Sequence, residues 1–182
     1  MLVQVVEPVA ESREWPLSLA SSSLTGEAAI RKRPTGGAMK TVRDVLDKKG
    51  VQVWSVGPGM TVYETLQLMA EKEIGAVLVM EAERPVGIFS ERDYARQVIL
   101  KGKASKDTPV RDVMTSRVVF ARLEQTLEDC MALMTDKRIR HLPVLVEGRV
   151  HGILSIGDVV KAVISEKEFI ISQLETYITS GG

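Results

Sequence analysis

Apolar residues recur at helical spacing in two runs, and each run begins directly after a threonine. The first run follows Thr61 and the second follows Thr126. Each threonine has an acidic residue three positions later, Glu64 or Asp129, and this is the pattern of a helix-capping box. The apolar members lie three or four residues apart and would share one helix face: Val62, Leu66 and Met69, then Leu127, Met131 and Met134. The pattern predicts two amphipathic helices that begin after the threonines.

Short β-branched stretches lie on both sides of each predicted helix. Residues 51–56 and 118–121 form extended stretches before the helices. Two strands joined by a tight turn follow each helix, because apolar runs there are separated by only two or three turn-forming residues. The predicted strands are 76–81 with 85–89, and 141–146 with 149–154. A second helix is expected to begin at Ser90 in the first case and at Ser155 in the second, so that each unit has the order β-α-β-β-α.

The two units are copies of one another. Residues 61–97 align with residues 126–162 at a constant shift of 65, and 42–46 align with 110–114 at a shift of 68, because the first copy has three extra residues near 48–50. A self-match of this length indicates a duplicated unit. One copy alone has little core, so we expect an α/β (α+β) fold with two repeats packed about a pseudo-twofold axis.

Four segments follow from this organisation: 1–40, 41–104, 105–168 and 169–182. The first contains serine and proline clusters without a sustained helix or strand period, and we expect it to be a disordered extension. The last segment continues the final helix, along which an apolar stripe runs from Val160 in the third segment to Ile178. Two interpretations of that stripe remain open: it packs on its own repeat, or it forms the seam of a homodimer with a long C-terminal helix.

Composition narrows the function. The chain has 182 residues, with 24 Lys+Arg and 24 Asp+Glu, and zero net charge argues against a nucleic-acid binder. One cysteine and two histidines make a zinc site improbable and exclude an intramolecular disulfide. The chain has neither a membrane-length apolar run nor the marks of a secretory signal, so we expect a cytoplasmic protein without membrane or nucleic-acid partners.

The strand-to-helix junctions carry the candidate chemistry. Both copies read Gly-Ile-x-Ser-x-x-Asp, with Ser90 and Asp93 in the first and Ser155 and Asp158 in the second. Such a pair can simply cap a helix. Alternatively, the carboxylate can accept hydrogen bonds from vicinal ribose hydroxyls, while the helix start favours a nearby phosphate. The first junction adds two cationic residues, Arg92 and Arg96, whereas the second adds Gly157 and Lys161. This difference predicts stronger phosphate binding at the first junction.

Residues 41–168 resemble a tandem pair of cystathionine-β-synthase (CBS) domains, also called a Bateman module. The marks are the repeated Gly-Ile-x-Ser-x-x-Asp, the Leu142-Pro143-Val144 strand after Ile139-Arg140-His141, and the Val-Arg-Asp-Val openers. The resemblance implies that two clefts bind adenosyl ligands: AMP, ADP, ATP, NAD(H) or S-adenosylmethionine. It also implies that the Ser/Asp pairs hold the ribose and that strand starts and openers surround the adenine: Ile74, Gly75, Ala76, Ile139, Arg140 and His141, with Val42, Val110 and Thr115.

Two functions are therefore carried forward. The first is a non-catalytic regulatory sensor of adenine nucleotides, which has no catalytic cofactor and is a homodimer. The second is a protein-interaction adaptor, for example a regulator of redox partners, with vestigial clefts. An enzyme is not expected, because Ser155 already has its counterpart in the other repeat and its surroundings are out of step with a nucleophile elbow. Cys130 lies on an apolar helix face and is expected to pack in the core.

Overall fold

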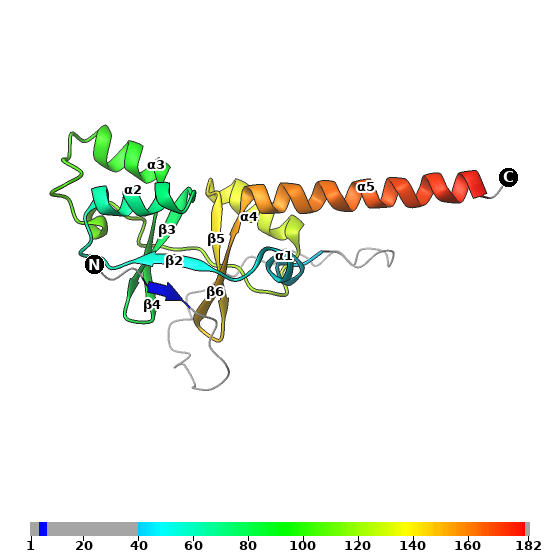
Figure 1. Cartoon of the computed structure of the whole chain (residues 1–182), viewed down its shortest axis with the longest axis horizontal. Helices are drawn as coiled ribbons and strands as arrows, with labels where there is room; N and C mark the ends of the chain where they lie inside the picture. The colour runs from blue at the N-terminus through cyan, green and yellow to red at the C-terminus, as the bar shows by residue number, and fades with distance from the viewer. Residues whose placement is uncertain (1–3, 7–39, 181–182) are drawn as a thin grey trace.

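The computed structural model describes residues 4–6 and 40–180. The two repeats lie side by side, and one long helix projects from the second repeat to the C-terminal end (Figure 1). The predicted α/β fold with a long C-terminal helix is confirmed.

The first repeat contains a four-stranded sheet in the order β1-β2-β3-β4. Its strands are β1 (Gln4–Val6), β2 (Val53–Val56), β3 (Ala76–Glu81) and β4 (Arg84–Ser90). β2 runs parallel to β3, and β3 runs antiparallel to β4. The helices are α1 (Val42–Lys49), α2 (Val62–Glu71) and α3 (Glu91–Asp93), and the chain continues from α3 into a π-helical turn, η1 (Tyr94–Ile99).

The second repeat has the same plan with a smaller sheet. It contains a 3₁₀ turn, η2 (Val110–Asp112), the helices α4 (Leu127–Lys137) and α5 (Ile156–Ser180), and the antiparallel strands β5 (His141–Val146) and β6 (Arg149–Ser155). Ala121 forms a single parallel bridge to Val144. This bridge is the counterpart of the Val56–Val79 pair between β2 and β3. The predicted extended stretch 118–121 is therefore reduced to one bridge in the second repeat.

The helix starts form as the threonine pattern predicts. Thr61 caps α2 in a full capping box with Glu64, in which each side chain bonds the other residue's backbone. Thr126 caps α4 by accepting a hydrogen bond from the backbone N–H of Asp129 at 3.1 Å. The bounds of the four hairpin strands, β3 to β6, agree with the prediction to within one residue at each end, whereas β2 starts two residues later than the predicted stretch 51–56.

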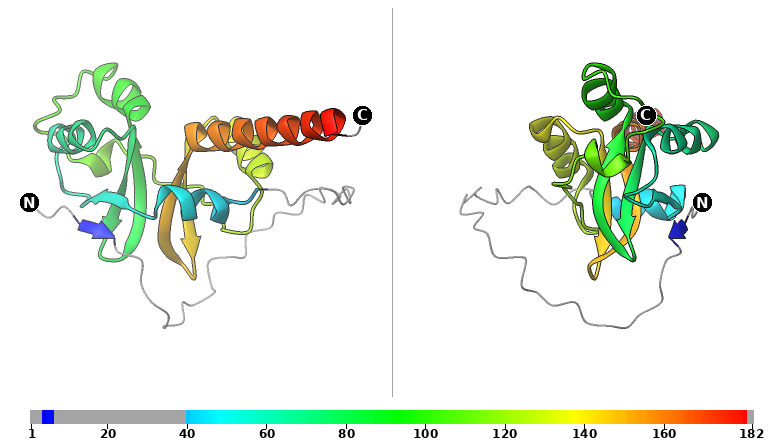
Figure 2. Two further views of the ribbon diagram at one scale, coloured as in Figure 1. Left: turned by 45° about the vertical axis from the view of Figure 1, so that its right-hand side comes forward. Right: turned by 90° about the vertical axis from the view of Figure 1, so that its left-hand side faces the viewer.

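The openers cross between the repeats. The Val42 N–H donates to Gln125 O at 3.0 Å, and the Val110 N–H donates to Met60 O at 2.8 Å. The apolar side chains of α1 belong to the core of the second repeat, with Leu46 packed among Leu127, Leu142 and Leu154. Correspondingly, the core of the first repeat contains Val110 and Val113. In Figures 1 and 2, α1 (cyan) accordingly lies beside the yellow and orange elements of the second repeat.

The glycine of each repeated motif makes this crossing possible. A Cβ on Gly87 would lie 2.3 Å from Met114 Sδ, and a Cβ on Gly152 would lie 2.8 Å from Leu46 Cδ1. Met114 and Leu46 occupy matching positions of the two openers. Each opener therefore reaches the opposite repeat through a space that only a residue without a side chain leaves open.

The N-terminal expectation needs one correction. Residues Gln4–Val6 form β1 and pair antiparallel with β2, whereas the sequence predicts no strand in residues 1–40. The physical reason is that β2 would otherwise be an edge strand with unpaired backbone groups, which a β-branched stretch such as Val5-Val6 can pair. Lys40, at the end of the predicted extension, donates from Nζ to Ala162 O at 3.0 Å. The rest of the predicted extension lies outside the described residues.

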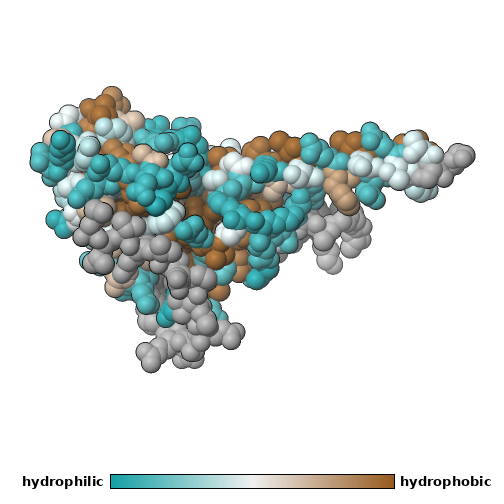
Figure 3. All heavy atoms as spheres, viewed as in Figure 1, coloured by the Kyte–Doolittle hydropathy of each residue, from teal (hydrophilic) through white to brown (hydrophobic). Residues whose placement is uncertain are grey.

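The final helix divides into a packed part and a projecting part. Near its start, Ile156, Ala162 and Val163 pack against the second core. Further along, Phe169, Tyr177 and Ile178 are 64%, 80% and 75% exposed. Figure 3 shows apolar side chains in brown between polar ones along the projecting part. Packing on its own repeat thus accounts for only the first part of the stripe. None of the helices among the described residues is long and apolar enough to cross a membrane.

Candidate functional site

Each Ser/Asp pair forms a reciprocal cap at the start of a helix. Asp93 Oδ2 accepts from the Ser90 N–H at 2.9 Å and from Ser90 Oγ at 2.6 Å. Asp158 Oδ2 accepts from the Ser155 N–H at 2.8 Å and from Ser155 Oγ at 2.6 Å. The capping interpretation of the motif is therefore correct in both repeats. It occupies one carboxylate oxygen of each aspartate and leaves Oδ1 outside the cap.

The crossing openers place a different group on each aspartate. Thr115 Oγ1 lies 3.1 Å from Asp93 Oδ1, and the Thr115 backbone pairs with Ile88. Lys49 takes the corresponding place in the second repeat: its Nζ donates to Asp158 Oδ2 at 2.6 Å and to Ile153 O at 3.1 Å. Each repeat's aspartate thus shares a site with the other repeat's opener, a pairing that the sequence leaves open.

The lysine contact sets the charge state of the second junction. Burial acts to raise the pKa of Asp158, but hydrogen bonds from Lys49 and Ser155 outweigh burial and hold that pKa below its ordinary value. Asp158 is therefore ionised at neutral pH and paired with a cation. Because Lys49 comes from the three-residue insertion of the first repeat, the first junction has no equivalent lysine.

The starts of β3 and β5 meet between the repeats. The position of a Cβ on Gly75 lies 3.6 Å from the imidazole of His141. A cavity of about 350 Å³ opens there between the strand starts and the end of α1, and it brings together five predicted site residues: Ile74, Gly75, Ala76, His141 and Ser155. Burial, helped by the positive charges of Arg140 and Lys49, lowers the pKa of His141, so this imidazole is neutral at pH 7.

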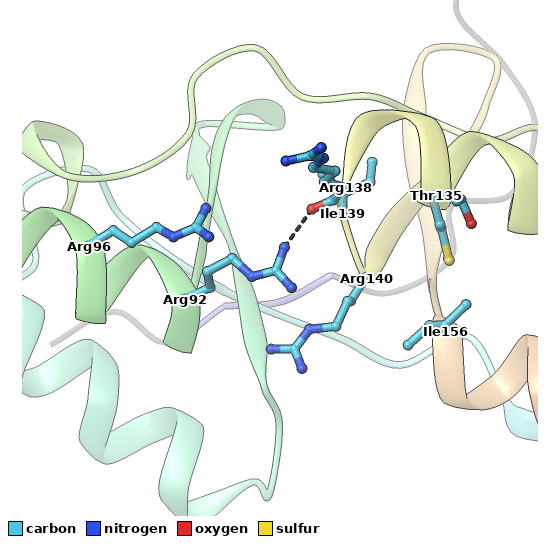
Figure 4. Close-up of a pocket in the computed structure, with 8 residues that line it drawn as sticks. Arg92, Arg96, Thr135, Arg138, Ile139, Arg140 and Ile156 are labelled. Carbon is cyan, nitrogen blue, oxygen red and sulfur yellow. Dashed lines mark hydrogen bonds between the residues drawn. The ribbon is translucent and has the colours of Figure 1, made fainter.

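A second cavity, of about 420 Å³, is lined by residues of both repeats. Four arginines line it: Arg92 and Arg96 from the first repeat, and Arg138 and Arg140 from the second. In Figure 4, Arg92 and Arg140 extend toward one another from the two repeats, and Arg96 lies behind Arg92 on the same helix. Arg92 Nη1 donates to Arg138 O at 2.5 Å. Ile139, also predicted as a site residue, completes this wall.

A third cavity, of about 280 Å³, lies between α1 and the start of α5. Asp158 and Lys161 line it together with Asp44, Lys48 and Lys49 of α1. Gly157 is exposed at the same helix start, and a Cβ there would be 3.7 Å from Ser155 Oγ. The residues predicted around the second aspartate therefore face α1.

Six predicted site residues are not among those that line the three cavities: Val42, Ser90, Asp93, Val110, Thr115 and Gly157. Val42 and Val110 are fully buried, and their side chains pack in the hydrophobic cores. Their side chains anchor the crossing openers in the cores, and their predicted approach to the adenine stays a prediction. Thr115, at the end of the second opener, does reach the site.

Sequence reasoning missed two residues of the site, Lys49 and Arg138. The inserted residues 48–50 were visible in the repeat alignment and could have pointed to Lys49. Arg138 ends α4 in the left-handed conformation with φ of 54°, as Glu73 does at the matching position with φ of 52°. The matched residues Arg138 and Glu73 have opposite charges, and this difference in the repeat alignment could have pointed to Arg138.

Cys130 is a core residue, as predicted. Its side chain is buried among the second core cluster, and burial raises its thiol pKa to about 11. A thiol that stays protonated at neutral pH is a poor nucleophile. Among residues 4–6 and 40–180, no three His, Cys, Asp or Glu side chains gather as metal ligands would.

Comparison with known protein families agrees with the duplicated fold. The family model described as "CBS domain" matches twice, at residues 42–99 and 110–165. The chain belongs to the CBS-domain family. The resemblance inferred from the sequence motifs is thereby confirmed.

Several CBS-domain proteins are similar over most of the chain. The mitochondrial CBS domain-containing protein CBSX3 of Arabidopsis thaliana is 36% identical over 161 residues, which is 83% of this chain and 78% of that protein. A crystallised CBS-domain protein of Burkholderia ambifaria, named for signal transduction, is 45% identical with a TM-score of 0.68, over 69% of this chain and 95% of its own. A hexameric CBS-CP12 protein from bloom-forming cyanobacteria is 25% identical with a TM-score of 0.62, over 69% and 72%. CBS-domain proteins of this kind are typically regulatory modules that bind adenosyl ligands, and some form oligomers.

Proposed function

We propose that this CBS-domain pair is a non-catalytic regulatory module that binds an adenosyl nucleotide, of the group AMP, ADP, ATP, NAD(H) and S-adenosylmethionine, between its repeats. The observation that carries the proposal is the arrangement of Asp93. Its Oδ2 completes the helix cap, and its Oδ1 faces the Thr115 hydroxyl of the crossing opener. A ribose hydroxyl could replace the Thr115 hydroxyl on Oδ1 without breaking the cap.

The surroundings support a nucleotide rather than a smaller polar ligand. The junction between the repeats offers two cavities. One, of about 350 Å³ beside Gly75 and Ala76, has apolar side chains such as Trp54 and Ile74 together with polar ones such as His141 in its lining, and the other, of about 420 Å³ beside Arg92, is lined by arginines. Small-molecule sites commonly have volumes of roughly 300–1,000 Å³. An adenosyl ligand has one apolar aromatic end and one charged end, so cavities of both kinds suit it.

The test is ligand-induced stabilisation of the full chain. At a ligand concentration of one hundred times Kd, binding adds about 2.7 kcal/mol to the unfolding free energy, which raises Tm by roughly 5–10 °C for a chain of this size. The variant Asp93→Asn with Asp158→Asn keeps an oxygen for the cap but loses a charged acceptor, and we expect Kd to rise by about tenfold to a hundredfold. Glu64→Gln alters a capping box outside the cleft and serves as the control.

The result that overturns the proposal is equal stabilisation of the wild-type chain and the double aspartate variant by every nucleotide of the group. The absence of stabilisation at millimolar concentrations of all of them would overturn it as well. A control variant that loses binding like the double variant would mean that helix capping, and not ribose contact, is responsible.

The homodimer expected of the regulatory module is supported by a separate observation, the exposed apolar side chains of α5, and we infer that a second copy of the chain covers them. Leu174, Tyr177 and Ile178 lie on one face of α5, and all three are more than half exposed. Leu174→Glu should convert a dimer to a monomer in size-exclusion chromatography with light scattering, whereas Ser172→Glu on the opposite face should not. A wild-type chain that is monomeric at tens of micromolar would contradict this inference. The location of the protein in the cell remains a prediction.

A further inference from the structure

The four-arginine cavity differs sharply from its counterpart in the other half of the molecule. Under the shift of 65 residues, Arg92 and Arg96 correspond to Gly157 and Lys161. The remaining lining positions pair Arg138 with Glu73, Arg140 with Gly75 and Ile156 with Glu91. Four arginines give the first set a charge of +4, whereas one lysine and two glutamates give the second set a charge of −1. The two repeats share one backbone plan, so the matching positions show which charge the fold itself requires. The excess of positive charge at the four-arginine cavity is therefore not required by the fold.

Four guanidinium groups in one cavity repel each other unless an anion lies between them. Within residues 40–180, none of the four arginines forms a salt bridge, and no acidic residue lines the cavity. The ordinary explanation for a cationic cluster, neutralisation by neighbouring carboxylates, therefore fails for the described residues. Arginine is the side chain best suited to bind phosphate oxygens in pairs.

The arginines also come from both repeats, and the side chain of Arg92 is held in place. Arg92 donates to Arg138 O across the junction, which fixes the Arg92 side chain at the end of α4. Arg138 is the left-handed cap of α4, so its backbone direction is set by the helix end. Figure 4 shows that the side chains from the two repeats extend into the same space. A phosphate chain in this space would touch both repeats at once.

We propose that this cavity binds the phosphate chain of a nucleoside di- or triphosphate, so that the first cleft selects polyphosphates over the monophosphate. The inference rests on the proposed function for the position of the nucleoside, because Arg92 directly precedes the ribose-binding candidate Asp93. The matching positions of the other cleft carry a net charge of −1, so we expect a weaker preference for polyphosphates there.

The experiment is isothermal titration calorimetry of the full chain with adenosine, AMP, ADP, ATP and inorganic tripolyphosphate at one ionic strength. We expect ATP to bind at least about tenfold more tightly than AMP, as one or more added charge-assisted contacts imply. Arg138→Asn with Arg140→Gln should abolish the advantage of ATP, so that the ratio of the ATP affinity to the AMP affinity falls to about one. Asparagine tolerates the left-handed conformation that Arg138 adopts, so this variant keeps the helix end.

Two further variants separate the possible outcomes. Arg122→Gln with Lys167→Gln removes the same charge from exposed positions outside the cavity and should retain the advantage of ATP. Equal affinity for AMP and ATP in the wild-type chain, or an unchanged ATP advantage in the Arg138/Arg140 variant, would overturn the inference and leave the proposed function intact. Conversely, tripolyphosphate binding as tightly as ATP, together with no effect of Asp93→Asn, would overturn the proposed function and leave an anion site at the arginines.

Discussion

Replacing Gly152 by alanine should destabilise the protein, because the new methyl group would collide with the opener that crosses from the other repeat. The added Cβ would lie 2.8 Å from Leu46 Cδ1 and 3.0 Å from Leu46 Cδ2. Leu46 is only 1% exposed and sits within the second core, so its side chain has little room to move. Overpacking of a well-filled core costs about 1–3 kcal/mol, and we expect a loss of unfolding free energy in that range.

A double-mutant cycle tests whether this particular contact is responsible. Leu46→Ala alone should cost about 2–5 kcal/mol, because it leaves a cavity in the core. In the double variant the methyl group on residue 152 would occupy part of that cavity. The double variant should therefore be more stable than the sum of the single effects implies, by about 0.5–3 kcal/mol. Urea unfolding followed by circular dichroism gives each free energy, with the m-value as a check on two-state behaviour.

Gly59→Ala is the matched control, since a Cβ at Gly59 has nothing within 4 Å. It should change the unfolding free energy by less than about 0.5 kcal/mol. If the effects of Gly152→Ala and Leu46→Ala were additive to within about 0.3–0.5 kcal/mol, the two residues would not be in contact. The crossing of the openers would then be refuted together with the assignment of each opener to the opposite cleft.

Three further predictions concern individual ionisable groups. Lys49→Gln should raise the pKa of Asp158 in an NMR titration, because it removes a hydrogen bond that lowers it; the stability change should be below about 1 kcal/mol, since the lysine side chain is 41% exposed. The lowered pKa of His141 means that the folded state binds fewer protons than the unfolded state. The contribution of neutral His141 to the unfolding free energy is therefore full above about pH 6.5 and is lost as the pH falls. His141→Gln should reduce the drop in the urea midpoint between pH 8 and 5.5, and an unchanged drop would contradict burial as the cause of the lowered pKa. Cys130, with a thiol pKa of about 11, should react with a thiol reagent at pH 8 only after denaturant is added; rapid labelling of the native chain would contradict its burial.

Sequence patterns predicted most of the helices and strands correctly, because these elements form through interactions between residues that are close in the sequence. The caps at Thr61 and Thr126 and the strand pairs depend on residues a few positions apart, and the duplication could be read directly from the alignment. The twin caps at Ser90 and Ser155 were likewise visible in the sequence, including the interpretation that they serve the helix. The family resemblance rested on these same residues and was confirmed by the family match.

The parts that could not be predicted depend on contacts between distant residues. Nothing near Val42 indicates that α1 packs in the second core, because its apolar spacing would suit either repeat. The pairing of Lys49 with Asp158 follows from that crossing and from the inserted residues. The strand at Gln4–Val6 exists only because β2 offers a free edge. Arg138 joins Arg92 only when the end of α4 reaches the other repeat.

The two aspartates, although equivalent in sequence, differ in the structure that each one caps. Asp93 caps α3, which lasts three residues before the chain passes into η1, whereas Asp158 caps α5, which has 25 residues and projects from the molecule. Asp158 Oδ2 also accepts from Lys49 of α1, so a ligand hydroxyl that approached this carboxylate would meet α1 and the start of α5 together. A ligand shifts an equilibrium only through contacts that differ between two states. The contacts of the second junction lie at the start of the helix that projects farthest, and the arginines lie at the first junction. On the proposed function, the two repeats divide two tasks, recognition of phosphate charge and connection to α5, between positions that the duplication made equivalent.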